Sequence, residues 1–421
     1  MTYLAILLFS TVVWLAKGHY DPSVPLLVLV FLAWSYLTVF KPSSSVVKKG
    51  ESYFYCYFPW LSAVMMAIKP NLIYVLDGLR PAYQFYRFIP LTLTAISLRK
   101  TKIIGWSVAF AFLIFFFTAL YLSPNPHIDV FVSNTSAVDF FLQGLNPYSQ
   151  TYVDIYGGRF DYHPGFVYWP MALYLQTVSK LIFGDIRSIL VLAWWCAAFF
   201  FPKNNPRAAQ LKKIWWLIPF LAFGFEQGWI DPLLSLMAAI TLWSMKNKKW
   251  WLTAIAIGLA ASIKQYGFII GAFPLIALAL DQGWKVVGKV SLFAGILFIA
   301  LLAPFLIWNL QDFISMTLTT HAHALARPDA LNFTAFWMKI SGTDFPWLAQ
   351  LAMTLLGFAL AFFHVFRNRA NRGLAVIPES WAIAFGFSTL FGKFAFCNYH
   401  WLLISFWLLS LAFEDDGRAL S

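Results

Sequence analysis

Long apolar runs without charged residues constrain the fold of this chain more than any other feature. The clearest one extends from Ile104 to Leu122 and contains no Asp, Glu, Lys or Arg. As a helix, such a run is long enough to cross a hydrocarbon core of roughly 30 Å. Over all 421 residues only 11% are charged, whereas soluble domains carry roughly 25%. We therefore predict an all-α, polytopic membrane protein with roughly 12 to 14 transmembrane helices.

The positions of the basic residues predict how these helices are oriented. The net charge is +12, and most Lys and Arg residues lie in short clusters between apolar runs. Cytoplasmic loops carry such clusters in membrane proteins. A cluster at 99–102 precedes the run that ends at Leu122, so the polar segment that follows is expected outside the cytoplasm. No motif for binding nucleic acid accompanies the positive charge.

The apolar and polar segments divide the chain into three parts. Residues 1–103 are interpreted as N-terminal accessory transmembrane helices, 104–413 as the membrane core and 414–421 as a cytoplasmic tail. The core has two long outer loops, at 123–165 and 309–346, and the first is expected to carry surface helices. The first apolar run lacks a cleavage site and is interpreted as a retained span.

Several polar residues at the outer ends of the predicted helices need an explanation, because charged groups at a membrane edge cost free energy. Asp129 is a candidate general base for a hydroxyl group, with a solvated loop acid as the alternative. Asp139 is either a substrate ligand or a partner within the helical structure. Lys264 follows an apolar run and suits a phosphate, and the alternative is an interfacial lysine that extends toward water. Lys393 has the same interpretation.

The remaining polar motifs are less specific. Asn146-Pro147-Tyr148 has the composition of a turn, and His163 in Tyr162-His163-Pro164 either contacts a substrate or is simply packed. His321-Ala-His323 lacks a third ligand nearby, so we predict no metal site. The chain has no nucleotide-binding motif, which argues against an ATP-driven pump, and we expect no cofactor.

Taken in order, these motifs resemble those of the C-type, polyprenol-phosphate-sugar-dependent glycosyltransferases, and especially glycosyltransferase family 87. The resemblance covers roughly 104–413. The matching motifs are Ile128-Asp129-Val130, Gly144-Leu145-Asn146-Pro147-Tyr148, Tyr162-His163-Pro164, Lys264-Gln265, Arg327-Pro328-Asp329-Ala330-Leu331, and Lys393 with Phe396 and Asn398-Tyr399.

The resemblance implies an inverting transfer at the extracytoplasmic membrane face, with the sugar, expected to be mannose, carried by a polyprenyl phosphate. Asp129 would be the catalytic base, and Lys264, Lys393 or Arg327 would offset the charge of the leaving phosphate. The acceptor would be a lipid or a glycan. A bacterial or archaeal plasma membrane is the expected location. The substrate-binding residues would be Asp139, Asn146, Tyr148, Tyr162, His163, Asp231, Lys264, Gln265, Arg327, Asp329, Lys393, Asn398, Tyr399 and His400.

Two other classes of protein also place polar residues in a helical membrane bundle. A transporter or lipid flippase would do so, although transporter sites lie near the middle of the membrane. A lipid-linked polysaccharide ligase or polymerase would use a diphosphate donor, with His321, His323 and Arg327 at its centre.

Overall fold

The computed structural model describes residues 2–41, 49–68, 72–97, 102–158, 164–203, 205 and 207–414, and leaves the side chains of 49–52 and 102–105 undescribed. In these residues the fold is all-α, as predicted. No strand occurs in them; the single isolated β-bridge joins His19 to Ala330.

The α-helices follow the apolar runs closely. In the first half of the chain they are α1 (Thr2–Ala16), α2 (Val24–Phe40), α3 (Lys49–Ile68), α4 (Arg80–Tyr86), α5 (Ile89–Ile96), α6 (Lys102–Leu122), α7 (Asp129–Leu142), α8 (Pro170–Phe183), α9 (Ser188–Ala197) and α10 (Ala208–Trp216). In the second half they are α11 (Leu221–Gln227), α12 (Asp231–Lys246), α13 (Trp250–Ile263), α14 (Ile269–Gln282), α15 (Trp284–Ile314), α16 (Thr320–His323), α17 (Phe333–Ser341), α18 (Trp347–Arg372), α19 (Val376–Leu390) and α20 (Cys397–Ala412).

Many of these helices have the length and composition of membrane spans. Within the described residues, three helical segments are long and apolar enough to cross a membrane unaided, at 265–282, 284–323 and 347–390, and two bent pairs would each make one further span. Six shorter apolar helices accompany them. The protein is therefore a polytopic, integral membrane protein, while the exact count of 12 to 14 spans stays a prediction.

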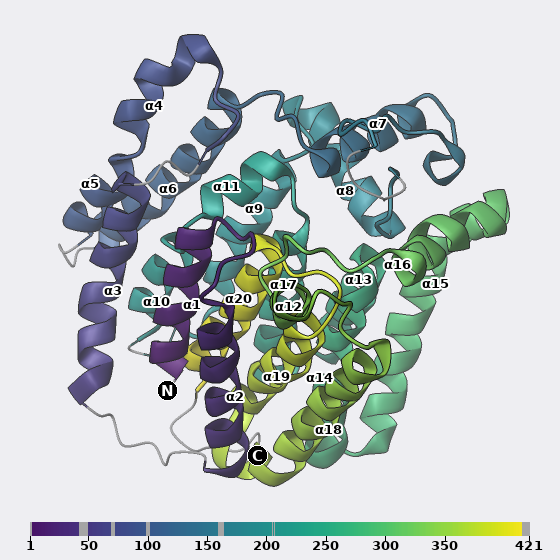
Figure 1. Ribbon diagram of the computed structural model, residues 1–421. Helices are drawn as coiled ribbons and strands as arrows, with labels where there is room; N and C mark the ends of the chain where they lie inside the picture. The colour runs from purple at the N-terminus through teal and green to yellow at the C-terminus, as the bar shows by residue number, and fades with distance from the viewer. Residues whose placement is uncertain are drawn as a thin grey trace.

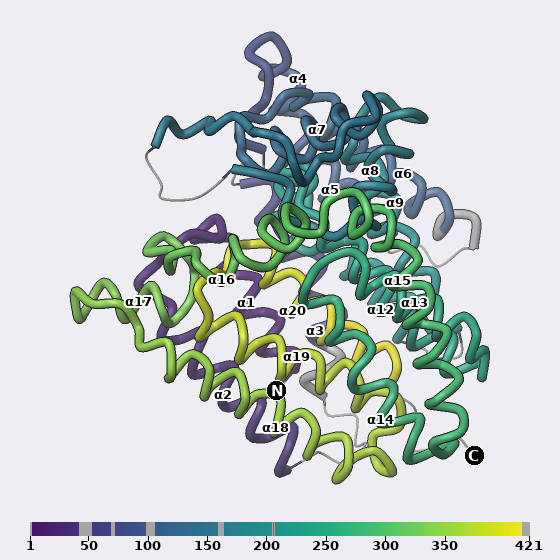
Figure 2. The backbone as a smooth tube through the Cα atoms, turned by 90° about the vertical axis from the view of Figure 1, so that its right-hand side faces the viewer, coloured from purple at the N-terminus to yellow at the C-terminus, as the bar shows by residue number. Residues whose placement is uncertain are grey.

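The helices form a bundle with a distinct cap at one end. Figures 1 and 2 both place α4, α7 and α8 at one end of the bundle and the turn between α18 and α19 at the other. That turn follows the basic residues at 367–372. Helix α8 meets α9 at a bend of 107°.

Some boundaries differ from the sequence prediction for identifiable reasons. Proline residues interrupt two apolar runs: α4 and α5 are separated just before Pro90, and α10 and α11 are separated around Pro219. Proline lacks an N–H for the helical ladder. The outer segment expected to begin at 309 is largely helical: Asn309 leaves the helical conformation and forms a kink between two helices, and a π-helical turn then leads into α16.

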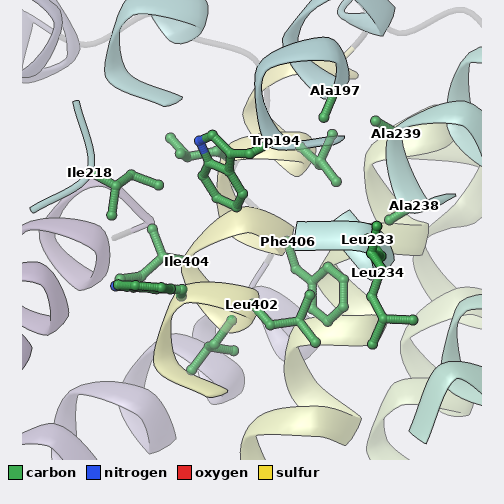
Figure 3. Close-up of a cluster of buried hydrophobic side chains, with 14 of the residues drawn as sticks. Trp194, Ala197, Ile218, Leu233, Leu234, Ala238, Ala239, Leu402, Ile404 and Phe406 are labelled. Carbon is green, nitrogen blue, oxygen red and sulfur yellow. The ribbon is translucent and has the colours of Figure 1, made fainter. Parts of the chain in front are cut away.

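Buried hydrophobic side chains fill the centre of the bundle where α9, α12 and α20 meet, with Trp194 and Phe406 among aliphatic neighbours (Figure 3). The indole ring of Trp194 stacks on Trp215, with ring centroids 4.3 Å apart. Each indole N–H donates to the other residue's carbonyl oxygen, at 3.1 and 2.9 Å. The N-terminal helices join the same core, since Phe9 of α1 packs edge-on against Trp407 of α20.

Gly224 of α11 permits the closest of these approaches. A methyl group at this position would lie 1.7 Å from Cζ3 of Trp401. We expect Gly224→Ala to lower the free energy of unfolding by roughly 1–3 kcal/mol, the usual cost of overpacking. The measurement is the melting temperature in detergent, which should fall. Gly288→Ala is the matched control, because nothing lies within 4 Å of a methyl group there. Equal melting temperatures for Gly224→Ala and wild type would contradict this packing.

Candidate active site

Asp129 begins α7, seven residues after α6 ends, as the sequence predicted. Its Oδ1 accepts a hydrogen bond from the backbone N–H of Val130 at 2.8 Å, and the Tyr156 hydroxyl donates to the same oxygen at 3.5 Å. Burial raises the pKa of this carboxyl group, while the Val130 N–H, the charge of Arg327 and the Tyr156 hydroxyl act in the opposite direction. Asp129 is thus a half-buried carboxylate with a raised pKa, which suits a general base.

A fully buried arginine fixes the chain on both sides of this carboxylate. Nη1 of Arg187 donates to the carbonyl oxygens of Ser123 and Glu226, at 2.9 and 3.1 Å. Its Nε and Nη2 bind the carboxylate of Asp185, and its guanidinium lies 4.6 Å from the ring centroid of Phe131 on α7. The sequence analysis missed Arg187, because nothing in its local sequence distinguishes it from a cytoplasmic basic residue.

Lys264 and Asp231 form a second buried centre, where the end of α13 meets the start of α12. The Lys264 Nζ lies 3.4 and 3.5 Å from the two carboxylate oxygens of Asp231. Asp231 also accepts from the Tyr266 hydroxyl and from Nδ2 of Asn398, the latter at 2.8 Å. Lys264 is only 5% exposed and Asp231 only 2%. Three predicted site residues from distant parts of the chain, Asp231, Lys264 and Asn398, are therefore in contact.

Aromatic rings surround the ammonium group of Lys264. Its Nζ lies 5.2, 4.6 and 5.1 Å from the ring centroids of Tyr168, Tyr266 and Tyr399. Within about 6 Å such rings attract a cation through their quadrupoles. Lys264 is thus enclosed by rings and paired with a carboxylate, which excludes the alternative of a lysine extended toward water.

The second outer loop supplies two further cations. Arg327 makes a two-pronged ion pair with Asp329, at 2.8 and 2.9 Å, and its backbone N–H donates to the carbonyl oxygen of Lys393 at 3.1 Å. The Lys393 Nζ donates to the carbonyl oxygen of Ala322 at 2.7 Å. Among the side chains that the structure describes, no carboxylate lies within ion-pair distance of Lys393.

Tyr168 connects Asp129 with the Lys264 cluster. Burial raises the pKa of this tyrosine, and the negative charges of Asp231 and Asp129 add to the effect. Asp129 also experiences the positive charge of Arg327. Asp129 therefore acts on Arg327 and on Tyr168, and the ring of Tyr168 is one of those that surround Lys264.

Three predicted substrate-binding residues of the first loop have structural partners. Asp139 forms an ion pair with Lys180, which joins α7 to α8. The side chain of Asn146 accepts from the backbone N–H of Tyr148 at 3.1 Å and so caps a short turn. The Tyr148 hydroxyl donates to the carbonyl oxygen of Tyr168 at 2.9 Å. These contacts shape the loop, and Tyr148 also reaches the Lys264 cluster through Tyr168, whose ring lies beside the ammonium group. Substrate binding by the three residues stays a prediction.

Two other predicted residues are also tied to the backbone. Nε2 of Gln265 donates to the carbonyl oxygens of Val167 and Thr317, at 2.8 and 2.6 Å. His400 is buried and its Nε2 lies 2.9 Å from the carbonyl oxygen of Leu331. Both residues connect segments around the site. The predicted residues Tyr162 and His163 lie outside the described residues.

The potential metal ligands of the described chain do not gather in one place. No group of three or more His, Cys, Asp or Glu side chains within it has an arrangement that could hold a metal ion.

A family model identifies the class of protein to which this fold and site belong. The model of glycosyltransferase family 87 matches residues 163–391, more than half of the chain. The chain therefore belongs to glycosyltransferase family 87, and the predicted resemblance is confirmed. Asp129 precedes the matched residues, so its role rests on the geometry alone.

Curated relatives give a more particular comparison. Over 158 residues the chain is 31% identical to GPI mannosyltransferase 1 of Aspergillus oryzae, covering 35% of this chain and 34% of the relative. It is 26% identical over 184 residues to GPI mannosyltransferase 1 of Aspergillus fumigatus, covering 41% of each chain. The matched regions thus span less than half of either relative. No solved structure matches the chain.

These fungal relatives argue against the bacterial or archaeal membrane that the sequence analysis expected, and that part of the prediction is withdrawn. Family membership also favours an enzyme over the transporter or flippase alternative.

The Lys264–Asp231 pair yields a prediction about stability. Removing one partner of a buried ion pair costs roughly 3–5 kcal/mol, because the other charge stays buried without compensation. We expect Lys264→Met to lower the melting temperature in detergent, and the double variant Lys264→Met/Asp231→Asn to recover part of the loss. A single variant as stable as wild type would show that the pair does not stabilise the fold.

Proposed function

We propose that this protein is an inverting mannosyltransferase that moves mannose from a polyprenyl phosphate to a lipid or glycan acceptor at the extracytoplasmic face of a membrane. The observation that carries the proposal is the position of Asp129, a half-buried carboxylate at the start of α7 that lies within electrostatic reach of Arg327. Family membership and the mannosyltransferase relatives support the reaction class and the sugar.

Asp129 is suited to accept the proton of an attacking hydroxyl. Its raised pKa makes it a stronger base than an ordinary surface aspartate. The N-terminus of α7 and the Tyr156 hydroxyl keep it ionised and oriented. The hydroxyl oxygen then attacks the anomeric carbon, a new glycosidic bond forms, and the bond to the lipid phosphate breaks.

The leaving lipid phosphate requires positive charge. Lys393 is the best candidate to contact it, because its ammonium group is bound only to a carbonyl oxygen and retains free hydrogen-bonding capacity. Arg327 and Lys264 are already paired with Asp329 and Asp231, so they would mainly set the local field and the position of the loop. Cations fixed before the reaction stabilise developing negative charge at little reorganisation cost.

Asp129→Asn tests the base directly. We expect this variant to fold and to bind donor, but to lose at least roughly a hundredfold in transfer, since general base catalysis typically contributes 10²–10⁴-fold. The measurement uses purified protein in detergent, radiolabelled polyprenyl-phosphate-mannose and a total membrane lipid extract as acceptor. Asp139→Asn is the matched control, because that carboxylate pairs with Lys180 away from the site. Equal transfer by wild type and Asp129→Asn would refute the base assignment.

The rate should also report the raised pKa of Asp129. A base acts only when it is deprotonated, so kcat/KM should fall as pH falls through that pKa, at a pH above the ordinary value of 3.8. Tyr156→Phe removes a hydrogen bond that favours the carboxylate, so its acid limb should move to higher pH. An unchanged pH profile in Tyr156→Phe would show that Tyr156 does not influence the pKa of the catalytic base.

A further inference from the structure

A segment from the N-terminal region reaches the active site. Residues 72–76 lie between α3 and α4, far from the residues 163–391 that match the family model. The Ser123 hydroxyl donates to the carbonyl oxygen of Tyr74 at 3.0 Å. The N–H of Leu76 donates to the carbonyl oxygen of Leu122 at 3.1 Å. The segment is therefore bound along the end of α6, at the start of the connection to Asp129.

Glu226 holds the same segment from the other side. Its carboxylate accepts the backbone N–H of Ile73 at 3.0 and 2.8 Å and that of Tyr74 at 2.7 Å. Glu226 is fully buried, and an ionisable group is rarely buried without a specific partner. Glu226 lies within the residues that match the family model, and its carboxylate holds the backbone of Ile73 and Tyr74, which lie outside them.

These contacts form a closed ring with Arg187. Glu226 binds Tyr74 through its carboxylate, Tyr74 binds the Ser123 hydroxyl through its carbonyl oxygen, and Arg187 joins the carbonyl oxygens of Ser123 and Glu226. Arg187 also packs against Phe131, two residues beyond Asp129. The position of Tyr74 is thus fixed relative to the candidate base.

Tyr74 has a hydroxyl group that is not used in the contacts that hold the segment. Its side chain is half-buried, and among the described residues no hydrogen-bond partner is found for its hydroxyl. Burial raises the pKa of Tyr74, and the charges of Glu226 and Asp129 raise it further. Tyr74 is therefore a neutral hydrogen-bonding group within electrostatic reach of Asp129.

The charges around Asp129 indicate which substrate meets Tyr74. The charges that act on Tyr74 are those of two carboxylates, Glu226 and Asp129. The cations Arg327, Lys264 and Lys393 are not among them and are grouped with one another, since Arg327 is bound to Lys393 and both lysines act on His321. The two carboxylates repel a lipid phosphate, and the three cations attract it. A neutral group that carries hydroxyls is not repelled by the two carboxylates near Tyr74.

We propose that residues 72–76 form the acceptor-binding wall of the active site, with Tyr74 as an acceptor-binding residue and Glu226 as the residue that positions it. This inference rests on the proposed function and names the acceptor as a neutral, hydroxylated group, such as a sugar, at the reacting end. The N-terminal helices then contribute to substrate binding in addition to packing on the core.

The test separates the use of acceptor from the use of donor. Wild type, Tyr74→Phe and Glu226→Gln are assayed with radiolabelled polyprenyl-phosphate-mannose and a graded series of total membrane lipid extract. Tyr74→Phe should raise the amount of extract needed for half-maximal rate roughly three- to tenfold, the effect of one lost hydrogen bond, with the KM for donor and the melting temperature unchanged. Glu226→Gln should raise the same quantity.

Tyr36→Phe is the matched control, since it removes the same hydroxyl group from a tyrosine of α2 that is 54% exposed and packs against Phe40, outside the segment at 72–76. Two results would overturn the inference while wild type stays active. In the first, Tyr74→Phe raises the KM for donor. In the second, Tyr74→Phe changes neither the KM for donor nor the amount of extract needed for half-maximal rate. Absence of transfer by wild type would instead overturn the proposed function, and this inference with it.

Discussion

The geometry of the active site depends on one buried cation. Arg187 is fully buried between the ends of α6, α9 and α11. Its guanidinium group donates hydrogen bonds to the carboxylate of Asp185 and to the carbonyl oxygens of Ser123 and Glu226. A cation in such a place is tolerated only when its partners are fixed. The same contacts therefore oblige the carbonyl oxygens of Ser123 and Glu226 to approach each other, and the ring of Phe131 covers the guanidinium. Asp129 lies between these fixed points.

The second centre has a different character. Lys264 and Asp231 neutralise each other inside a set of tyrosine rings. Neither charge is fully available to a ligand, so the pair contributes mainly a directed dipole and a rigid joint between α12 and α13. Lys393 differs from both, because its ammonium group is bound to a carbonyl oxygen and carries a charge that this partner does not neutralise. This division explains why cations that look equivalent in the sequence have different tasks.

The fold class was predictable because membrane helices are encoded by composition and length, which are visible in any single segment. Asp129, Asp231, Lys264 and Asn398 were predictable as a group, since each is a polar residue at the outer end of an apolar run. Asp139, Asn146 and Tyr148 were assigned to substrate, but they bind neighbouring backbone or side chains, because turn and cap chemistry uses the same residue types as ligand binding.

Arg187 and Tyr74 were beyond the reach of sequence reasoning. Their roles follow from the way in which α6, α9 and α11 converge, and local patterns contain no information on that packing. The helix breaks at 87–88 and 217–220 are different, because Pro90 and Pro219 mark them in the sequence itself.

The second outer loop has one further consequence. Arg327 and Leu331 donate their backbone N–H groups to the carbonyl oxygens of Lys393 and Ala395, so two segments about sixty residues apart are joined like neighbouring strands. A shift of either segment carries the other with it. The charges of Arg327 and Lys393 therefore move together, so any displacement of the loop changes the attraction of both charges for an anion at the same time.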